Sequence, residues 1–191
     1  QAFGWWASGG VAGALAVQRG IGLPHEESWG RSSSMAYRVE RNRSTGVGDV
    51  TALAAGGVER RLEAGAPYHG PLLHRGPGRA EGWSNDTPVV LAWRPYAGKH
   101  TSNYIDEAHW KDSISEAGSK QMEPLSLGDW NQSRWMGLME AARAFAEDSG
   151  LLADSARIEL LSIADEAISA CSTAVEATAL LCMLGESVVI L

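Results

Sequence analysis

The chain has 191 residues, of which 45% are hydrophobic and 20% charged, and its formal net charge is −7. These values are typical of a globular protein of one or two small domains. The acidic balance argues against a nucleic-acid partner, because no excess of cations is left to neutralise phosphates. The two cysteines, Cys171 and Cys182, lack metal-binding spacing and favour a reducing compartment, so we expect a cytoplasmic protein. The apolar run Phe3–Val17 is too short and too glycine-rich to span a bilayer, so we expect no membrane partner.

The chain enters a glycine-rich stretch, Gly4–Gly10, almost at its start, and small apolar residues follow from Val11 to Val17. The second part predicts a helix buried on most sides. A glycine loop before a helix leaves the first N–H groups open, and these favour a bound phosphate. The same glycines are equally typical of a helix that packs closely on its neighbours. Because a domain rarely begins inside such a loop, we expect a piece of a longer protein.

A second helix is predicted from His25 to about Arg43, with an acidic first turn. Met35 and Val39 are expected to face inward, together with Ala36. Glu40 lies near the end of this helix, where a lone glutamate is ordinarily a solvated surface group.

The stretch Ser44-Thr45-Gly46-Val47-Gly48-Asp49-Val50 places an aspartate directly after two glycines. Glycine allows a sharp turn that can press backbone N–H groups against an anion and hold one carboxylate in a fixed place. An ordinary Gly-Asp turn that closes a helix has the same composition. The residues Val58–Leu62, which follow Gly56-Gly57, predict a strand.

The region from Pro67 to Pro88 is rich in Gly, Pro, His and Arg, which predicts a long loop or domain connection. Its histidines lack the paired spacing of a zinc site. The apolar run Pro88–Trp93 predicts a strand of the buried type. After it, Lys99, Thr101 and Ser102 precede a helix that opens at Tyr104. They predict either a second anion site or a plain hydroxyl N-cap.

From Asp106 onward the pattern is mostly helical. Gly150 is expected to cap one helix, and a further helix is predicted over Ser155–Ser169. The chain closes on a predicted strand, Val188–Leu191. The residues that recur at helical spacing and predict a core face are Trp135, Leu138, Met139, Ala142, Phe145 and Ala146.

The order of these pieces resembles the GHMP small-molecule kinases, and within them the archaeal pantoate kinases. Ala36-Tyr37-Arg38-Val39-Glu40, continued through Ser44–Val50, is similar to the segment before and through the family's Gly-Leu-Gly-Asp motif. Cys182-Met183-Leu184-Gly185-Glu186-Ser187-Val188 is similar to its closing Met-Leu-Gly-Glu-Thr-Val motif. With gaps, the resemblance covers nearly the whole chain.

The resemblance implies an α+β fold of two domains. Residues 1–70 would be part of an ATP-binding domain related to domain 2 of ribosomal protein S5, and residues 71–191 a ferredoxin-like domain. It also implies phosphoryl transfer from ATP, with Mg²⁺, to the hydroxyl of pantoate in coenzyme A biosynthesis. Asp49 would be the catalytic carboxylate, and Ser8 and Glu40 would hold the metal. The implied nucleotide-binding residues are Gly4, Ser8, Gly9, Gly10, Gly46 and Gly48, and the implied substrate-binding residues are Lys99, Thr101 and Ser102.

Trp6 stands where the family places a serine beside the metal, so either Ser8 substitutes for it or the site is impaired. Three hypotheses therefore stay open. They are a pantoate kinase, a GHMP kinase with another acceptor such as homoserine, shikimate or mevalonate, and a catalytically impaired paralogue that binds nucleotide. A homodimer is compatible with all three.

Overall fold

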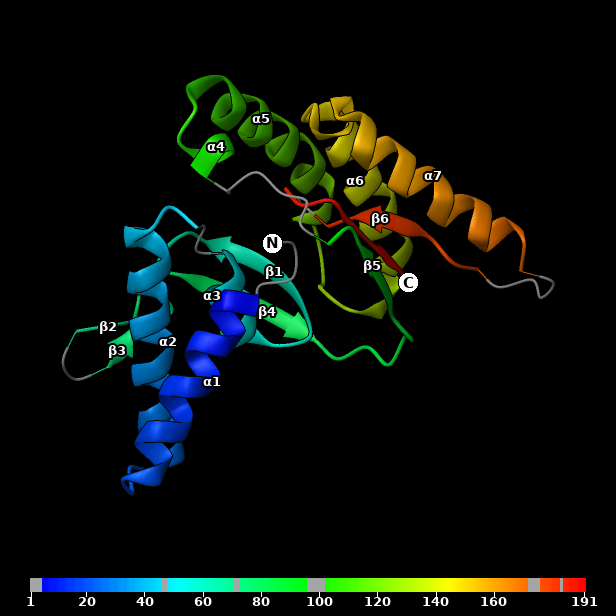
Figure 1. The fold of residues 1–191 in the computed structure, drawn as a ribbon. Helices are drawn as coiled ribbons and strands as arrows, with labels where there is room; N and C mark the ends of the chain where they lie inside the picture. The colour runs from blue at the N-terminus through cyan, green and yellow to red at the C-terminus, as the bar shows by residue number, and fades with distance from the viewer. Residues whose placement is uncertain (1–4, 46–47, 71–72, 96–101, 172–175, 183) are drawn as a thin grey trace. The chain divides into compact units, whose positions relative to one another are not determined.

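The computed structural model describes residues 5–45, 48–70, 73–95, 102–171, 176–182 and 184–191 (Figure 1). It divides into two compact units, Gly4–Asn85 and Asp86–Leu191. We call these the N-terminal and the C-terminal unit, and each is described by itself. Among the described residues, no helix is both long and apolar enough to cross a bilayer.

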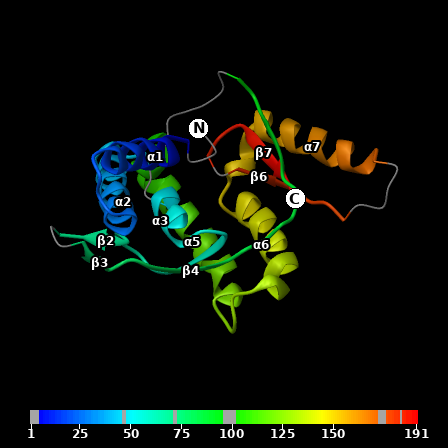
Figure 2. The same ribbon diagram turned by 90° about the horizontal axis from the view of Figure 1, so that it is seen from below.

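The N-terminal unit is built on two long helices, α1 (Trp5–Gly20) and α2 (His25–Asn42), which a tight turn connects. Gly22 has a φ of +91°, a value that suits glycine in such a turn. The helices lie side by side and run in opposite directions (Figures 1 and 2). A short third helix, α3 (Gly48–Ala55), packs against both.

The buried face of α2 is small and polar. Ser28, Ser32 and Ala36 are spaced four residues apart and are buried, and the Gln18 side chain of α1 donates to the Ser32 hydroxyl (2.9 Å). The expected inward positions of Met35 and Val39 are wrong, because these side chains are 56% and 60% exposed. Small residues form the contact face, since they let α1 approach closely, and this leaves the bulky ones outside.

The expectation that the first helix is buried on most sides is also wrong. Ala7 and Val11 are buried, whereas Val17 is 67% exposed. Only the beginning of α1 lies where α2 and α3 both pack against it.

The strands of the N-terminal unit correct the long loop predicted from Pro67 to Pro88. This region contains three strands, one of which pairs antiparallel with the predicted strand at 58–62. This compact unit extends to Asn85, because β1 and β4 form one sheet. The expected division into family domains at residue 70 stays a prediction. The strands are β1 (Val58–Glu63), β2 (Tyr68–His69), β3 (His74–Arg75) and β4 (Arg79–Trp83), with β1 paired to β4 and β2 to β3.

The C-terminal unit packs helices on a three-stranded antiparallel sheet of order β5-β7-β6. Leu160, Leu161 and Ala164 of α7 form a core with Ala179 of β6 and Val188 of β7. The predicted helix over Ser155–Ser169 and the cap at Gly150, with a φ of +77°, are confirmed. The helices are α4 (Ser102–Ile105), α5 (Ala108–Leu125), α6 (Trp135–Asp148) and α7 (Ser155–Ser169), with 3-10 turns at Gln132–Arg134 and Leu151–Ala153; the strands are β5 (Val90–Trp93), β6 (Ala179–Leu181) and β7 (Ser187–Ile190).

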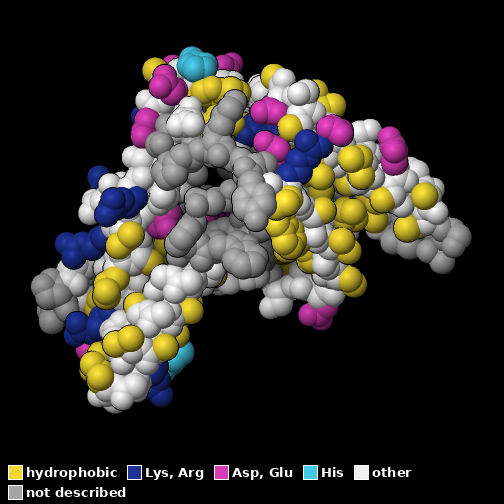
Figure 3. Space-filling view, in the orientation of Figure 1, with side chains coloured by type: hydrophobic (Ala, Val, Ile, Leu, Met, Phe, Trp, Pro, Cys, Tyr) yellow, Lys and Arg dark blue, Asp and Glu magenta, His cyan; other side chains and the backbone are white. Residues whose placement is uncertain are grey.

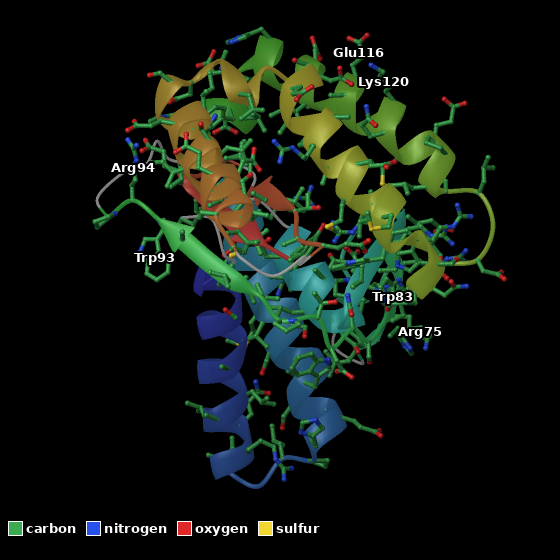
Figure 4. The ribbon with its side chains drawn as sticks, turned by 90° about the vertical axis from the view of Figure 1, so that its right-hand side faces the viewer. Arg75, Trp83, Trp93, Arg94, Glu116 and Lys120 are labelled. Atoms are coloured by element: carbon green, nitrogen blue, oxygen red, sulfur yellow. The ribbon has the colours of Figure 1, made fainter. Side chains whose placement is uncertain are left out.

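Strand β5 was expected to be buried, and this expectation is wrong. Ala92 packs against the core beneath α7, but Leu91 and Trp93 alternate to the other face of the strand and are exposed. Figure 4 shows the Trp93 side chain extending outward from β5. Helices cover one face of β5 only. The continuous apolar run in the sequence therefore does not mean that both faces of the strand are buried.

The mixture of helices and small sheets confirms the α+β class. The specific two-domain arrangement of the GHMP kinases stays a prediction.

Candidate functional site

One apolar cluster brings together the parts of the N-terminal unit that carry the predicted site. It joins Ala7 and Val11 of α1, Ala36 and Tyr37 of α2, and Val50 of α3. On each of the three helices, one member of the cluster lies close to a predicted site residue. Ser8 follows Ala7, Glu40 lies one turn after Ala36, and Asp49 precedes Val50. The packing therefore places the N-terminal ends of α1 and α3 beside the C-terminal part of α2.

This arrangement brings two helix N-terminal ends, which carry partial positive charge, close to two acidic side chains. The first N–H groups of a helix have no partner within it, and together with the helix dipole they favour an anion. The beginnings of α1 and α3 supply two such ends, each with a buried residue in the shared cluster. The site thus combines anion-binding helix ends with the carboxylates of Glu40 and Asp49, which can attract a cation.

Glu40 is buried, with an exposed fraction of 7%. Its carboxylate accepts a hydrogen bond from the Thr45 hydroxyl (2.6 Å), and the Thr45 backbone N–H donates to the Glu40 carbonyl (3.2 Å). Glu40 is buried because it continues the face of Ser32 and Ala36, and burying a carboxylate is costly unless a donor or a cation compensates for it. Sequence reasoning assigned no role to Thr45, although Thr45 lies inside the stretch that singled out Asp49.

Asp49 lies in the first turn of α3, directly after Gly48. Asp49 as a whole residue is exposed, but burial of its carboxyl raises its pKa above the usual value, while the Arg61 guanidinium acts in the opposite direction. A carboxylate with a raised pKa is a stronger base, which suits it to accept a proton from a hydroxyl. The stretch before Asp49 is strained at Ser44, which has a φ of +50°.

Arg61 is a second residue of this site that sequence reasoning missed. Its guanidinium donates to the Gly48 carbonyl (2.9 Å) and pairs with Glu59 (2.9 Å), so it ties strand β1 to the beginning of α3. Glu59 and Arg61 are two residues apart and share one face of β1. The sequence did contain a signal for Arg61. Glu59 and Arg61 place an acid and a base at alternate positions of a predicted strand that follows the Gly-Asp turn.

The glycine loop predicted at Gly4–Gly10 is corrected by the structure. Helix α1 begins at Trp5, so Ser8, Gly9 and Gly10 are helical. In an α-helix, only the first four N–H groups are left without an intrahelical acceptor, which excludes those of Gly9 and Gly10. The space where a side chain would stand at either glycine is open. The binding roles expected of Ser8, Gly9 and Gly10 stay predictions.

Several predicted site residues lie outside the described part of the chain, namely Gly4, Gly46, Lys99 and Thr101. Ser102 begins α4 in the C-terminal unit. Within the described residues no group of three or more His, Cys, Asp or Glu side chains could hold a metal. A cation at Glu40 would therefore depend on hydroxyls, backbone carbonyls, water or a bound phosphate for its other ligands, which suits Mg²⁺ better than zinc.

Comparison with known proteins gives one finding. The chain is 31% identical over 150 residues to a protein of Thermococcus kodakarensis named pantoate kinase. The chain is similar to pantoate kinase. The alignment covers 78% of the chain but 44% of that relative, so the chain spans less than half of the relative's length. Neither a protein-family model nor a solved structure matches the chain.

The similarity to pantoate kinase confirms the resemblance that the Gly-Asp stretch and the closing motif indicated. The roles of individual residues are not tested by it.

Proposed function

We propose that the protein is an ATP-dependent kinase that transfers a phosphoryl group to the hydroxyl of pantoate, a step towards coenzyme A. The observation that carries this proposal is the convergence of two helix N-terminal ends, a buried glutamate and Asp49 around one apolar cluster. The similarity to pantoate kinase supports the choice of acceptor.

The donor set of the site fits a nucleotide with its magnesium ion. Phosphoryl transfer depends mainly on alignment and on neutralising phosphate charge. The free N–H groups at the beginning of α1 would orient the phosphates, and the Glu40 carboxylate would hold the cation with Ser8. When bound, ATP supplies the phosphoryl group and Mg²⁺ neutralises its charge.

The acceptor side of the reaction belongs to Asp49. As the acceptor oxygen forms its bond to the γ-phosphorus of ATP, the bond from that phosphorus to the bridging oxygen of ADP would break and ADP would leave. The acceptor O–H bond would break at the same time, and its proton would pass to the Asp49 carboxylate. Arg61 would position Asp49 by fixing the Gly48 carbonyl, without contacting the acceptor.

The proposal is tested by assaying the gene product that contains this chain with ATP, Mg²⁺ and a panel of pantoate, homoserine, shikimate and mevalonate. We expect ADP release that depends on pantoate. Asp49→Asn should lower kcat by about 100-fold or more while leaving nucleotide affinity nearly unchanged, because removal of a general base affects the transition state. The exposed Asp112 provides a matched control, and Asp112→Asn should retain the wild-type kcat.

Turnover with another acceptor would support the proposed kinase activity but would show that the acceptor is not pantoate. Nucleotide binding without turnover would instead favour an impaired paralogue. One observation supports that alternative: Trp6 occupies the position of the family's serine within the first turn of α1. The proposal would be contradicted altogether if the gene product neither bound nucleotide nor turned over any acceptor.

A further inference from the structure

A hollow in the N-terminal unit lies away from Glu40, between α2 and the β2–β3 hairpin. Its volume is about 960 Å³, within the range of small-molecule sites. We call it the arginine groove. Arg31, Arg38 and Arg41 of α2 line it, with Gln18 of α1 and Tyr68 and His69 of the hairpin.

The groove and the proposed kinase site lie on opposite faces of α2. Arg31 and Glu40 are nine residues apart, which is two and a half turns of helix. Glu40 faces the interior, whereas Arg38 and Arg41 are exposed. A ligand in the groove would therefore be distinct from the nucleotide and the acceptor proposed above.

In the part of the chain that the structure describes, the positive charge of the groove is compensated only at Arg31. Among the described residues that line it none is acidic, although the whole chain carries a net charge of −7. Arg31 is paired with Glu27 (2.6 Å), but within the described residues Arg38 and Arg41 make no ion pair or side-chain hydrogen bond. Figure 3 shows dark blue side chains along the side of the N-terminal unit where α2 and the hairpin lie. Clustered like charges repel one another, and a bound anion removes that repulsion.

The spacing of the three arginines indicates the size of the anion. Arg38 and Arg41 are three residues apart, which is about 4.5 Å along the axis, so both can contact one anionic group. Arg31 lies about 10 Å from Arg38 along the same face and can reach a second group. Guanidinium groups match the geometry of phosphate oxygens, and Tyr68 and His69 on the opposite wall add hydrogen-bonding groups.

We propose that the arginine groove binds a small anion carrying two or more phosphate groups, which it holds between Arg38 and Arg41 at one end and Arg31 at the other. The proposal does not depend on the kinase function, because Arg31, Arg38 and Arg41 lie outside the proposed kinase site, although Tyr37 both lines the groove and packs in the apolar cluster.

Inorganic phosphate and tripolyphosphate, each without Mg²⁺, are the probes that test this proposal. Both are titrated into the ¹⁵N-labelled chain while the arginine Nε–Hε resonances are followed by NMR. We expect saturable shifts for Arg38 and Arg41, and an affinity for tripolyphosphate at least tenfold higher than for phosphate, because the longer anion spans both positions. Equal affinity for both probes would overturn the second phosphate position.

Arg38→Gln and Arg41→Gln should each weaken tripolyphosphate binding by about tenfold. Arg43 is the matched control, because it follows α2, is exposed and does not line the groove. Arg43→Gln makes the same change in net charge and should leave binding within twofold of wild type. Equal weakening by all three variants, or no shift at Arg38 and Arg41, would overturn the proposal.

Discussion

At the scale of single residues, the carboxyl of Asp49 lies between two opposing influences. Burial raises its pKa, and the Arg61 guanidinium lowers it by a smaller amount. The first influence makes Asp49 a better base, and the second keeps its ionised form accessible. Arg61 reaches this position only because β1 and the beginning of α3 are adjacent in the fold.

This balance predicts how stability depends on pH. Since the pKa of Asp49 is raised in the folded state, the folded chain holds that proton more tightly than the unfolded chain, and ionisation costs stability. Asn cannot ionise, so Asp49→Asn should be more stable than wild type at pH 7. The difference should disappear as the pH falls below 3.8, the ordinary value for an aspartate. Urea unfolding at a series of pH values measures it.

Asp148 provides a control of opposite sign. Hydrogen bonds from Lys120 and Gln121 hold the pKa of Asp148 below its usual value. Its ionised form therefore adds stability that is present above pH 3.8 and is lost as the pH falls, so Asp148→Asn should destabilise at pH 7. A change of stability in the same direction in both variants would contradict these opposite pKa shifts.

At the scale of elements, the turn before β1 depends on glycine. Gly57 has a φ of +63°, and a Cβ atom built there would lie 2.2 Å from the carbonyl oxygen of Trp83 on β4. The pairing of β1 with β4 thus requires a residue without a side chain at this position. Nothing in the Gly56-Gly57 pair alone distinguishes this requirement from an ordinary flexible turn.

Gly57→Ala should therefore destabilise the chain by at least about 2 kcal/mol, from a backbone conformation that disfavours side chains and a contact that forces the strands apart. Gly13→Ala is the matched control. Gly13 lies in α1 with open space at its Cβ position, so alanine should stabilise by about 0.5–1 kcal/mol. Urea unfolding measures both, and equal effects would contradict the structural explanation.

At the scale of the whole molecule, each unit has a hydrophobic cluster of its own. Val50 is fully buried in the cluster of the N-terminal unit, and Val188 is buried in that of the C-terminal unit. We expect truncation of either valine to loosen mainly its own unit, because apolar packing is local.

Hydrogen exchange measures this directly. Val50→Ala should accelerate exchange of protected amides mainly within residues 4–85, and Val188→Ala mainly within residues 86–191, each at a cost of about 1–3 kcal/mol. The two substitutions remove the same groups and control for each other. Uniform acceleration along the whole chain by either variant would show one cooperative unit instead.

The sequence by itself determined the α+β class, the boundaries of α2 and α7, the strands at 58–62 and 188–191, and the resemblance to pantoate kinases. These features follow from local periodicity, glycine and proline positions and short motifs, which neighbouring residues specify among themselves. Asp49 was singled out in this way as a candidate, because two glycines precede it closely in the sequence.

Only the tertiary structure decided which faces are buried and which distant residues meet. Met35 and Val39 are apolar but exposed, whereas Glu40 is charged but buried, because small side chains form the contact between α1 and α2. The link from Arg61 to Gly48 and the pairing of β1 with β4 join residues far apart in the chain. Local propensity does not encode such contacts, since their free energy arises only when the packed elements exclude water between them.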